Sequence, residues 1–206
     1  MSGPRLVVKL GGSFTASARL GDWLARIAAS RGVLLVPGGG PFADAVRATQ
    51  PLIGYDEEAA HDMAMMAMAQ FGRALVSLAP ALELAASLAR IASVCGRGGI
   101  AVAVPWPMLA AEPSLPRRWD VTSDAIALWL ARHFATPLLV IKQVSAEAGA
   151  TPGSLAAAGV IDRFFPVLAE GFAPPIHLAG PADVPAAPAL DPASLPGRAL
   201  GMTAMA

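Results

Sequence analysis

The sequence is poor in cysteine and in charged residues, and each shortage argues against a class of protein. Only one of the 206 residues, Cys95, is a cysteine, which excludes an internal disulfide and a cysteine-cluster metal site. Charged residues make up 15% of the chain and the formal net charge is zero, which argues against a nucleic-acid surface or a polybasic membrane anchor. Hydrophobic residues reach 55%. We therefore expect a homo-oligomer that buries part of an apolar helical surface.

Long apolar runs are also lacking. A membrane-spanning helix needs about 20 consecutive apolar residues. The most apolar region, residues 63–95, is interrupted by two arginines, a proline and a glutamate. The first apolar run contains Lys9, and no secretory cleavage pattern follows it. We expect a cytoplasmic protein without membrane contact.

Two short apolar runs each end in glycines and lead into a helical pattern. Residues 5–10 are followed by Gly11-Gly12-Ser13 and then by an amphipathic segment capped by Asp22. Residues 33–36 are followed by Pro37-Gly38-Gly39-Gly40-Pro41, and a helix begins near Pro41. Apolar runs of this length are typical of buried strands. The alternation of strand, glycine loop and helix predicts an α/β fold with a parallel sheet.

The remaining elements follow from the same patterns. We predict helices over residues 56–78, 81–93 and 125–131, with helical stretches in 155–170, including 160–165. Strands are predicted over residues 100–104, 138–141 and 176–178, with a last edge strand in 197–203 and a loop over 108–116. The sequence shows no repeat and no clear linker, so a single domain over 1–206 is predicted.

Charged residues and glycines meet at the ends of the predicted strands. Lys9 lies just before the first glycine pair, and Lys142 directly follows the strand over 138–141. Asp124 opens the helix that precedes this strand. The carboxyl ends of parallel strands face one edge of the sheet, where ligands of α/β proteins bind. This set of groups suits phosphoryl transfer, which needs a well-positioned phosphoryl group and positive charge on its oxygens. The two ammonium groups and the glycine N–H groups supply the charge, and the carboxylate keeps the lysines charged.

Each of these features also has a purely structural interpretation. A Gly-Gly pair can end an ordinary strand with Lys9 on the surface, and Asp124 can be a helix-start carboxylate favoured by the helix dipole. Charged residues such as Lys142 often end strands. The second glycine loop has neither a Walker sequence nor the dinucleotide fingerprint. His61 and Asp62 lie at the polar start of the long helix. They either are solvated or capping residues, or they contact an acceptor. The methionines of that helix are expected to pack in the core or at a subunit contact.

Three segments resemble the amino acid kinase family, which includes acetylglutamate, glutamate, aspartate, uridylate and isopentenyl phosphate kinases. They are Val7-Val-Lys9-Leu-Gly-Gly-Ser13, Val36-Pro-Gly38-Gly-Gly-Pro-Phe-Ala-Asp44 and Thr122-Ser-Asp124-Ala-Ile-Ala127. The resemblance covers residues 5–142 well and the rest loosely. It implies a three-layer αβα sandwich with a mainly parallel central sheet. It also implies an acceptor-binding part over about residues 1–118, a nucleotide-binding part over about 119–206, and ATP as its Mg²⁺ complex.

The resemblance also implies roles for individual residues. Lys9 and Asp124 would be catalytic, and Lys142 is expected to supply a second catalytic charge. The phosphoryl group and the nucleotide would be bound by Gly11, Gly12, Ser13 and Gln143. The acceptor would be bound by Gly38, Gly39, Gly40, Asp44, His61, Arg118 and Asp120. Of these, Arg118 is our choice for an acceptor-anion contact, the alternative being a solvated arginine.

Some segments look closest to a subgroup, the kinase of methanofuran biosynthesis, which phosphorylates an aminomethylfuran methyl phosphate with ATP. They lie within residues 61–68, 118–124, 141–142 and 160–166. The sequence departs from the wider family after residue 141, where Lys142-Gln143-Val144-Ser145 replaces an Asp-Val-Asp-Gly-like turn. The Gly-Gly-Met…Lys helix, which often supplies the second catalytic lysine, is also missing.

Three functions remain open on this sequence. The first is an ATP-dependent kinase for a phosphate- or carboxylate-bearing acceptor, foremost a phosphomonoester of the aminomethylfuran type. The second is a non-catalytic relative that binds an anion or regulates a partner. The third is a nucleotide-binding subunit of a hetero-oligomer.

Overall fold

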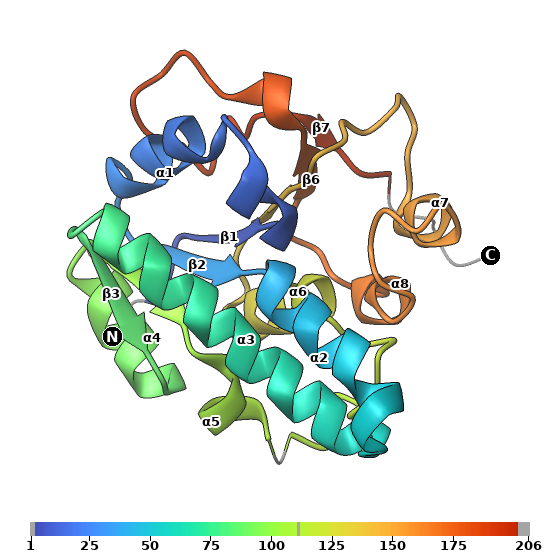
Figure 1. Ribbon diagram of the computed structural model, residues 1–206. Helices are drawn as coiled ribbons and strands as arrows, with labels where there is room; N and C mark the ends of the chain where they lie inside the picture. Colours follow the sequence, from blue (N-terminus) through green and yellow to red (C-terminus); the bar gives the residue numbers. More distant parts are fainter. Residues whose placement is uncertain (1–2, 111, 202–206) are drawn as a thin grey trace.

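Seven strands form one sheet in residues 3–110 and 112–201, the part of the chain that the computed structural model describes (Figure 1). The strand order is β3-β4-β2-β1-β5-β6-β7, and only β7 is antiparallel to its neighbour. The strands are β1 (Leu6–Leu10), β2 (Val33–Pro37), β3 (Leu82–Ala85), β4 (Ile100–Ala103), β5 (Leu138–Ile141), β6 (Ile176–Ala179) and β7 (Arg198–Ala199). Every residue of β1, β2, β4 and β5 is buried, as expected for parallel strands covered on both faces.

Helices cover both faces of the sheet. They are α1 (Leu20–Ala28), α2 (Gly40–Ile53), α3 (Glu57–Leu78), α4 (Leu88–Gly96), α5 (Pro105–Leu109), α6 (Ser123–Phe134), α7 (Pro152–Ala157) and α8 (Phe165–Ala169), with 3-10 helices η1 (Gly12–Ala16) and η2 (Pro181–Asp183). Among the described helices, none combines the length and apolarity needed to cross a membrane. The helices α2 and α3 lie side by side as a hairpin in front of the sheet (Figure 1).

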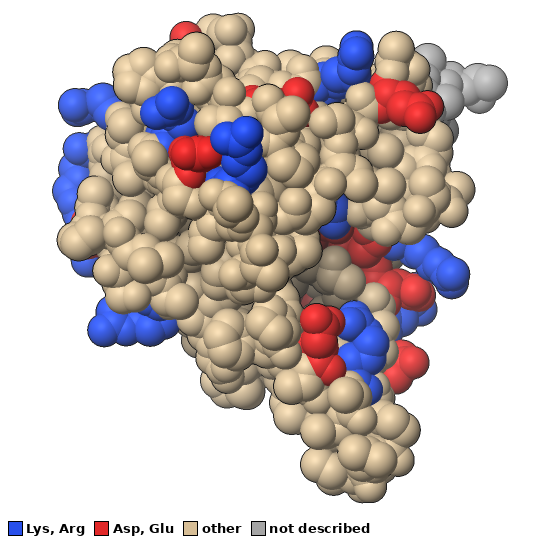
Figure 2. Space-filling model, turned by 45° about the horizontal axis from the view of Figure 1, so that its top comes forward, with Lys and Arg blue, Asp and Glu red and all other residues tan. Residues whose placement is uncertain are grey.

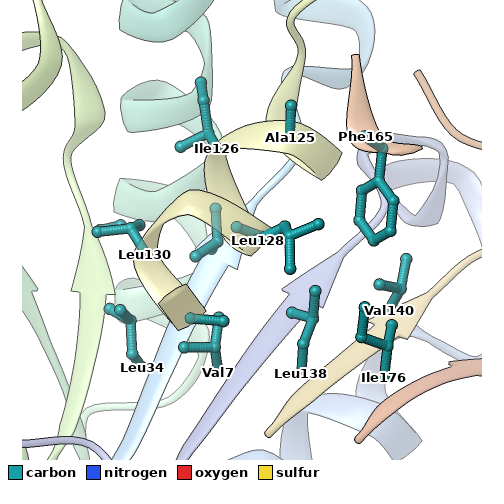
Figure 3. Packing of buried hydrophobic residues seen from close by; sticks show 14 of the residues in the cluster. Val7, Leu34, Ala125, Ile126, Leu128, Leu130, Leu138, Val140, Phe165 and Ile176 are labelled. Carbon is teal, nitrogen blue, oxygen red and sulfur yellow. The ribbon is translucent and has the colours of Figure 1, made fainter. Parts of the chain in front are cut away.

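The strand residues alternate between two cores. Leu6, Val8 and Leu10 of β1 pack with Trp23 and other residues of α1 and α3 on one face. Val7 points to the other face, where α6 lies across the sheet and Phe165 of α8 packs in the same cluster (Figure 3). Because side chains alternate along a strand, Lys9 shares the face of Val7 and is directed toward α6.

The predicted αβα sandwich with its mainly parallel sheet is therefore confirmed. The strands near residues 5–10, 33–36, 100–104, 138–141 and 176–178 are confirmed, and so are the long helix over 56–78 and the helix over 125–131. Asp56 caps the long helix, its side chain accepting from Ala59 N at 2.8 Å. The edge strand over 197–203 is confirmed only at Arg198–Ala199, and residues 202–203 lie outside the described residues.

Four local predictions were wrong. The helix over 81–93 is instead strand β3 followed by α4, because Leu82–Ala85 pairs with β4. Residues 105–109 form a short helix that takes in the start of the expected loop. The first helix begins at Leu20, so Asp22 lies in its first turn and pairs with Arg19 instead of capping it. Residues 160–164 are not helical and separate α7 from α8.

Candidate functional site

The centre of the site is a carboxylate held between two ammonium groups. Lys9 Nζ lies 2.8 Å from Asp124 Oδ1, and Lys142 Nζ donates to Asp124 Oδ2 at 2.7 Å. Lys9 pairs with Val140 of the neighbouring strand β5, so Lys142 follows two residues later on the same face. Asp124 lies in the first turn of α6, which packs over this face. The two lysines are the only lysines of the sequence.

Burial sets the electrostatics of this centre. The side chains of Lys9 and Asp124 are 3% and 4% exposed. Burial, together with the nearby charge of Lys142, lowers the pKa of Lys9 to about 8. The attraction of Asp124 raises this pKa but does not outweigh the two other effects. Burial alone would raise the pKa of Asp124, but the two ammonium groups outweigh it and hold the pKa below its usual value. Lys9 contacts Oδ1 as an ion pair without hydrogen-bond alignment, so this oxygen accepts no hydrogen bond from the described residues.

The two glycine loops pack backbone against backbone beside this centre. A Cβ on Gly12 would lie 2.1 Å from Gly40 N, and one on Gly38 would lie 2.3 Å from Gly12 N. Gly40 itself has a positive φ of 52°. These close approaches leave no room for any side chain, so the glycines are needed for the fold of the site as well as for ligand access.

Not every glycine amide is free to bind an anion. Gly11 N–H donates to Ile141 O at 2.9 Å, and Gly38 N–H donates to Leu10 O at 2.8 Å. Gly12 and Ser13 begin η1, where the first N–H groups have no acceptor within the helix. The amides available to a ligand at the first loop are therefore those of Gly12 and Ser13 rather than that of Gly11.

A cavity of about 620 Å³ opens over the two lysines and the glycine loops. Its lining comprises Lys9, Gly11, Gly12, Ser13, Thr15, Ala16, Gly39, Gly40, Pro41, Ala43, Asp44, Arg47, Ala64, Met68, Trp119, Thr122, Ser123 and Lys142. Figure 2 shows a hollow on one face of the molecule with acidic and basic side chains gathered at its edge. A second cavity of about 550 Å³ lies next to it and shares Trp119 and Thr122 as lining residues.

The other residues predicted to bind the acceptor are dispersed. Asp44 lines the large cavity. His61 does not line it and is buried, with Nδ1 3.2 Å from Arg118 O. Burial lowers the pKa of His61. Arg118 pairs with Asp120 at 3.3 Å on the surface, and Asp120 lines the second cavity. The side chain of Gln143 makes one hydrogen bond to the described residues, a long one of 3.4 Å from Nε2 to Ser13 O.

Sequence reasoning missed Arg47 and Trp119, which line the large cavity together. Arg47 Cζ lies 4.4 Å from the centre of the Trp119 ring, and Trp119 Nε1 donates to Gln50 Oε1 at 2.8 Å. One signal was present in the sequence. Arg47 follows Asp44 by one helical turn, so a helix beginning at the glycine loop places both on one face.

Asp162 was also missed, although it holds the helix that carries Asp124. Its Oδ2 accepts from Thr122 N at 3.0 Å, from Thr122 Oγ1 at 2.9 Å and from Ala125 N at 2.8 Å, and its Oδ1 accepts from Phe165 N at 2.8 Å. Burial and the charge of Asp124 raise the pKa of Asp162, while the hydrogen bonds act the other way. Asp162 thus joins the start of α6 to the start of α8.

Within the described ranges, no three His, Cys, Asp or Glu side chains come together as a metal-binding group. The donors around the large cavity are instead ammonium groups and backbone amides, which suit phosphate oxygens. A nucleoside triphosphate fits this donor set. Lys9, Lys142 and the amides of Gly12 and Ser13 are the groups that would hold its phosphates.

Similar folds exist among solved structures. Uridylate kinase from Archaeoglobus fulgidus superposes with a TM-score of 0.66 at 16% identity, over 87% of this chain and 93% of that one. The fold is amino acid kinase-like. An isopentenyl phosphate kinase superposes with a TM-score of 0.55 at 13% identity, over the same shares of the two chains. Identities this low establish the amino acid kinase-like fold but not the activity. No protein-family model and no curated protein sequence matches the chain.

Proposed function

We propose that the protein is an ATP-dependent kinase that transfers the γ-phosphoryl group to a small phosphate- or carboxylate-bearing acceptor. The observation that carries this proposal is Asp124, ion-paired on both oxygens with the only two lysines of the chain. Phosphoryl transfer asks a protein for in-line positioning and for positive charge on the transferring group. Lys9 and Lys142 supply that charge, and both line the large cavity.

The roles of the protein groups follow from the geometry. An acceptor oxygen bonds to the γ-phosphorus of ATP while the bond from that phosphorus to the leaving ADP breaks. During this step the ammonium groups neutralise the oxygens of the transferring phosphoryl group. Asp124 fixes both lysines at 2.8 and 2.7 Å and favours their charged forms. Lys142 takes the place of the charge that the missing carboxyl-terminal helix supplies elsewhere in the family, which supports a kinase over a non-catalytic relative.

The acceptor that we put first is a phosphomonoester of the aminomethylfuran methyl phosphate type, which would be converted to its diphosphate. The sequence likeness within residues 61–68, 118–124 and 160–166 supports this choice. The two solved structures of similar fold are named for kinases of phosphate-bearing acceptors, uridylate and isopentenyl phosphate.

The test combines binding with turnover. Calorimetry should show MgATP binding with micromolar to millimolar affinity, and a panel of phosphomonoesters and carboxylates should contain an acceptor that is phosphorylated. Lys9→Ala should abolish transfer, whereas Arg73→Ala, which removes an exposed cation from α3, should leave it unchanged. The absence of nucleotide binding at saturating Mg²⁺ would contradict the proposal.

A further inference from the structure

Arg47 extends the positive charge of the large cavity away from the two lysines. It lies seven residues after Gly40, which corresponds to about 10 Å along the axis of α2. Its charged partner is Asp44, at 3.1 Å, and the two side chains are 58% and 71% exposed. An exposed pair of this kind is weak, so an anionic ligand can compete for the guanidinium. Four of its five N–H donors have no acceptor among the described residues.

Trp119 is held in place by the same helix. Gln50 and Arg47 are one turn apart on α2, and they contact the indole N–H and the ring face respectively. The ring therefore has a fixed orientation, and it lines both cavities. A fixed indole in a cavity wall is a platform for an apolar or flat group.

The charges around the cavity favour an anionic ligand. Lys9 and Lys142 share one carboxylate, Asp124, and among the described residues Arg47 has the exposed Asp44 as its acidic partner. Three cations thus face two carboxylates, and the excess charge is positive. A phosphomonoester dianion matches this excess better than a neutral alcohol does.

We propose that Arg47 and Trp119 recognise the acceptor, Arg47 by binding the phosphate of a phosphomonoester and Trp119 by packing against its apolar or flat organic part. The inference deepens the proposed function and rests on it. It makes these two residues determinants of acceptor specificity, and Arg47 lines the same cavity as the two lysines. A purely structural alternative is that they only tie α2 to the segment before α6.

The experiment measures binding of three probes by calorimetry: phenyl phosphate, inorganic phosphate and benzyl alcohol. In Arg47→Gln, the dissociation constants of both phosphates should rise about tenfold or more, the effect of losing a charge-assisted bond. In Trp119→Leu, phenyl phosphate should weaken about tenfold, while inorganic phosphate should change less than about twofold. Benzyl alcohol should not bind. Arg73→Gln, an exposed control on α3, should change nothing.

Several outcomes would overturn the inference. One is an unchanged affinity for phenyl phosphate in Arg47→Gln, with only a lower melting temperature, because a tie between elements would give that result. A second is equal binding of benzyl alcohol and phenyl phosphate. A third is the same loss for inorganic and phenyl phosphate in Trp119→Leu. Trp119→Phe, which keeps a ring, should bind phenyl phosphate as the wild type does. If the leucine variant fails to fold, Trp119→Met, which also lacks a ring, takes its place with the same expected loss.

Calorimetry with MgATP separates this inference from the proposed kinase. If the wild-type protein binds phenyl phosphate through Arg47 but binds no MgATP, the kinase proposal fails and the recognition of phosphomonoesters stands. If it binds MgATP but no phosphomonoester, the acceptor inference fails, and a carboxylate acceptor remains for the kinase.

Discussion

Lys142 Nζ donates to Asp124 Oδ2 at 2.7 Å, and this contact joins the end of β5 to the start of α6. Its partner ion pair, from Lys9, joins the same carboxylate to β1. The site therefore contains two ammonium groups although it has no lysine from a carboxyl-terminal helix.

Replacing Lys142 by methionine should lower kcat on the identified acceptor about 10²- to 10³-fold, the usual cost of one group that stabilises transition-state charge. The variant keeps a side chain of similar length but leaves Asp124 with Lys9 as its one ion-pair partner in the described part of the chain. Steady-state kinetics measure the effect. Val144→Ala, at an exposed position two residues later, is the control and should match the wild type. A Lys142→Met rate within about threefold of the wild-type rate would show that the charge is not used.

The site should lose activity as the pH rises through about 8. The pKa of Lys9 is about 8 because burial opposes its charge. The charged form, which is the active one, is therefore present below this pH and lost above it. The profile of kcat/KM for the free enzyme should show an alkaline limb there.

A direct measurement of this titration is available because the chain has only two lysines. Protein labelled with ¹³C at the lysine Cε should give two side-chain signals, one of which titrates near pH 8. Lys142→Met should remove the other signal and raise the pH at which the remaining one titrates, because the charge of Lys142 helps to lower the pKa of Lys9. A Lys9 signal that titrated near 10.5, the usual value for a lysine, would show that burial does not lower its pKa.

Gly12→Ala should destabilise the protein by about 1–3 kcal/mol, the typical cost of overpacking. The added Cβ would meet Gly40 N at 2.1 Å, and neither backbone can yield without moving a glycine loop. Gly21→Ala is the matched control, because a Cβ there meets nothing within 4 Å. Gly21 lies in α1, so this variant should gain about 0.5–1 kcal/mol from helix propensity. Urea unfolding compares the two, and equal stabilities would contradict the packing of the loops.

Asp162→Asn should lower the free energy of unfolding by about 1–3 kcal/mol, the cost of leaving a buried donor unpaired. The amide can accept on one side only, so either Phe165 N–H or the N–H groups at the start of α6 lose their acceptor. Asp191→Asn is the control, because Asp191 lies on the surface and its side chain accepts one hydrogen bond from the described residues, from Ala193 N. It should change stability by less than about 0.5 kcal/mol. A similar change in both variants would mean that Asp162 does not support the start of α6.

The sequence was sufficient to place the ion-paired centre because strand ends and helix starts are local signals. Lys9 and Lys142 follow from two apolar runs, and Asp124 follows from the start of one helix. The parallel order of the sheet then brings them to one edge. Three points stay predictions: the catalytic roles of these residues, the division of the chain into an acceptor part and a nucleotide part, and the assembly into a homo-oligomer.

Other parts could not be predicted because they depend on contacts between distant segments. Residues 82–85 contain leucine, glutamate and alanine, which favour helices, yet pairing with β4 makes them a strand. Asp162 bonds to Thr122, forty residues earlier, so no local pattern reveals its role. Arg118 was predicted to contact the acceptor anion and Arg47 was not considered, but Arg118 pairs with Asp120, whereas Arg47 lines the cavity.

The adjacency of β1 and β5 has a consequence for how the chain could be divided. Lys9 belongs to the part before residue 119, and Asp124 and Lys142 belong to the part after it. The sheet is continuous across that division, because Val7–Leu10 pairs with Leu138–Ile141. Two fragments produced separately would each hold an incomplete set of charges, and only their reassembly along this strand pair would restore the set. Phosphorylation of an acceptor by co-expressed fragments would then report that the two halves have found each other.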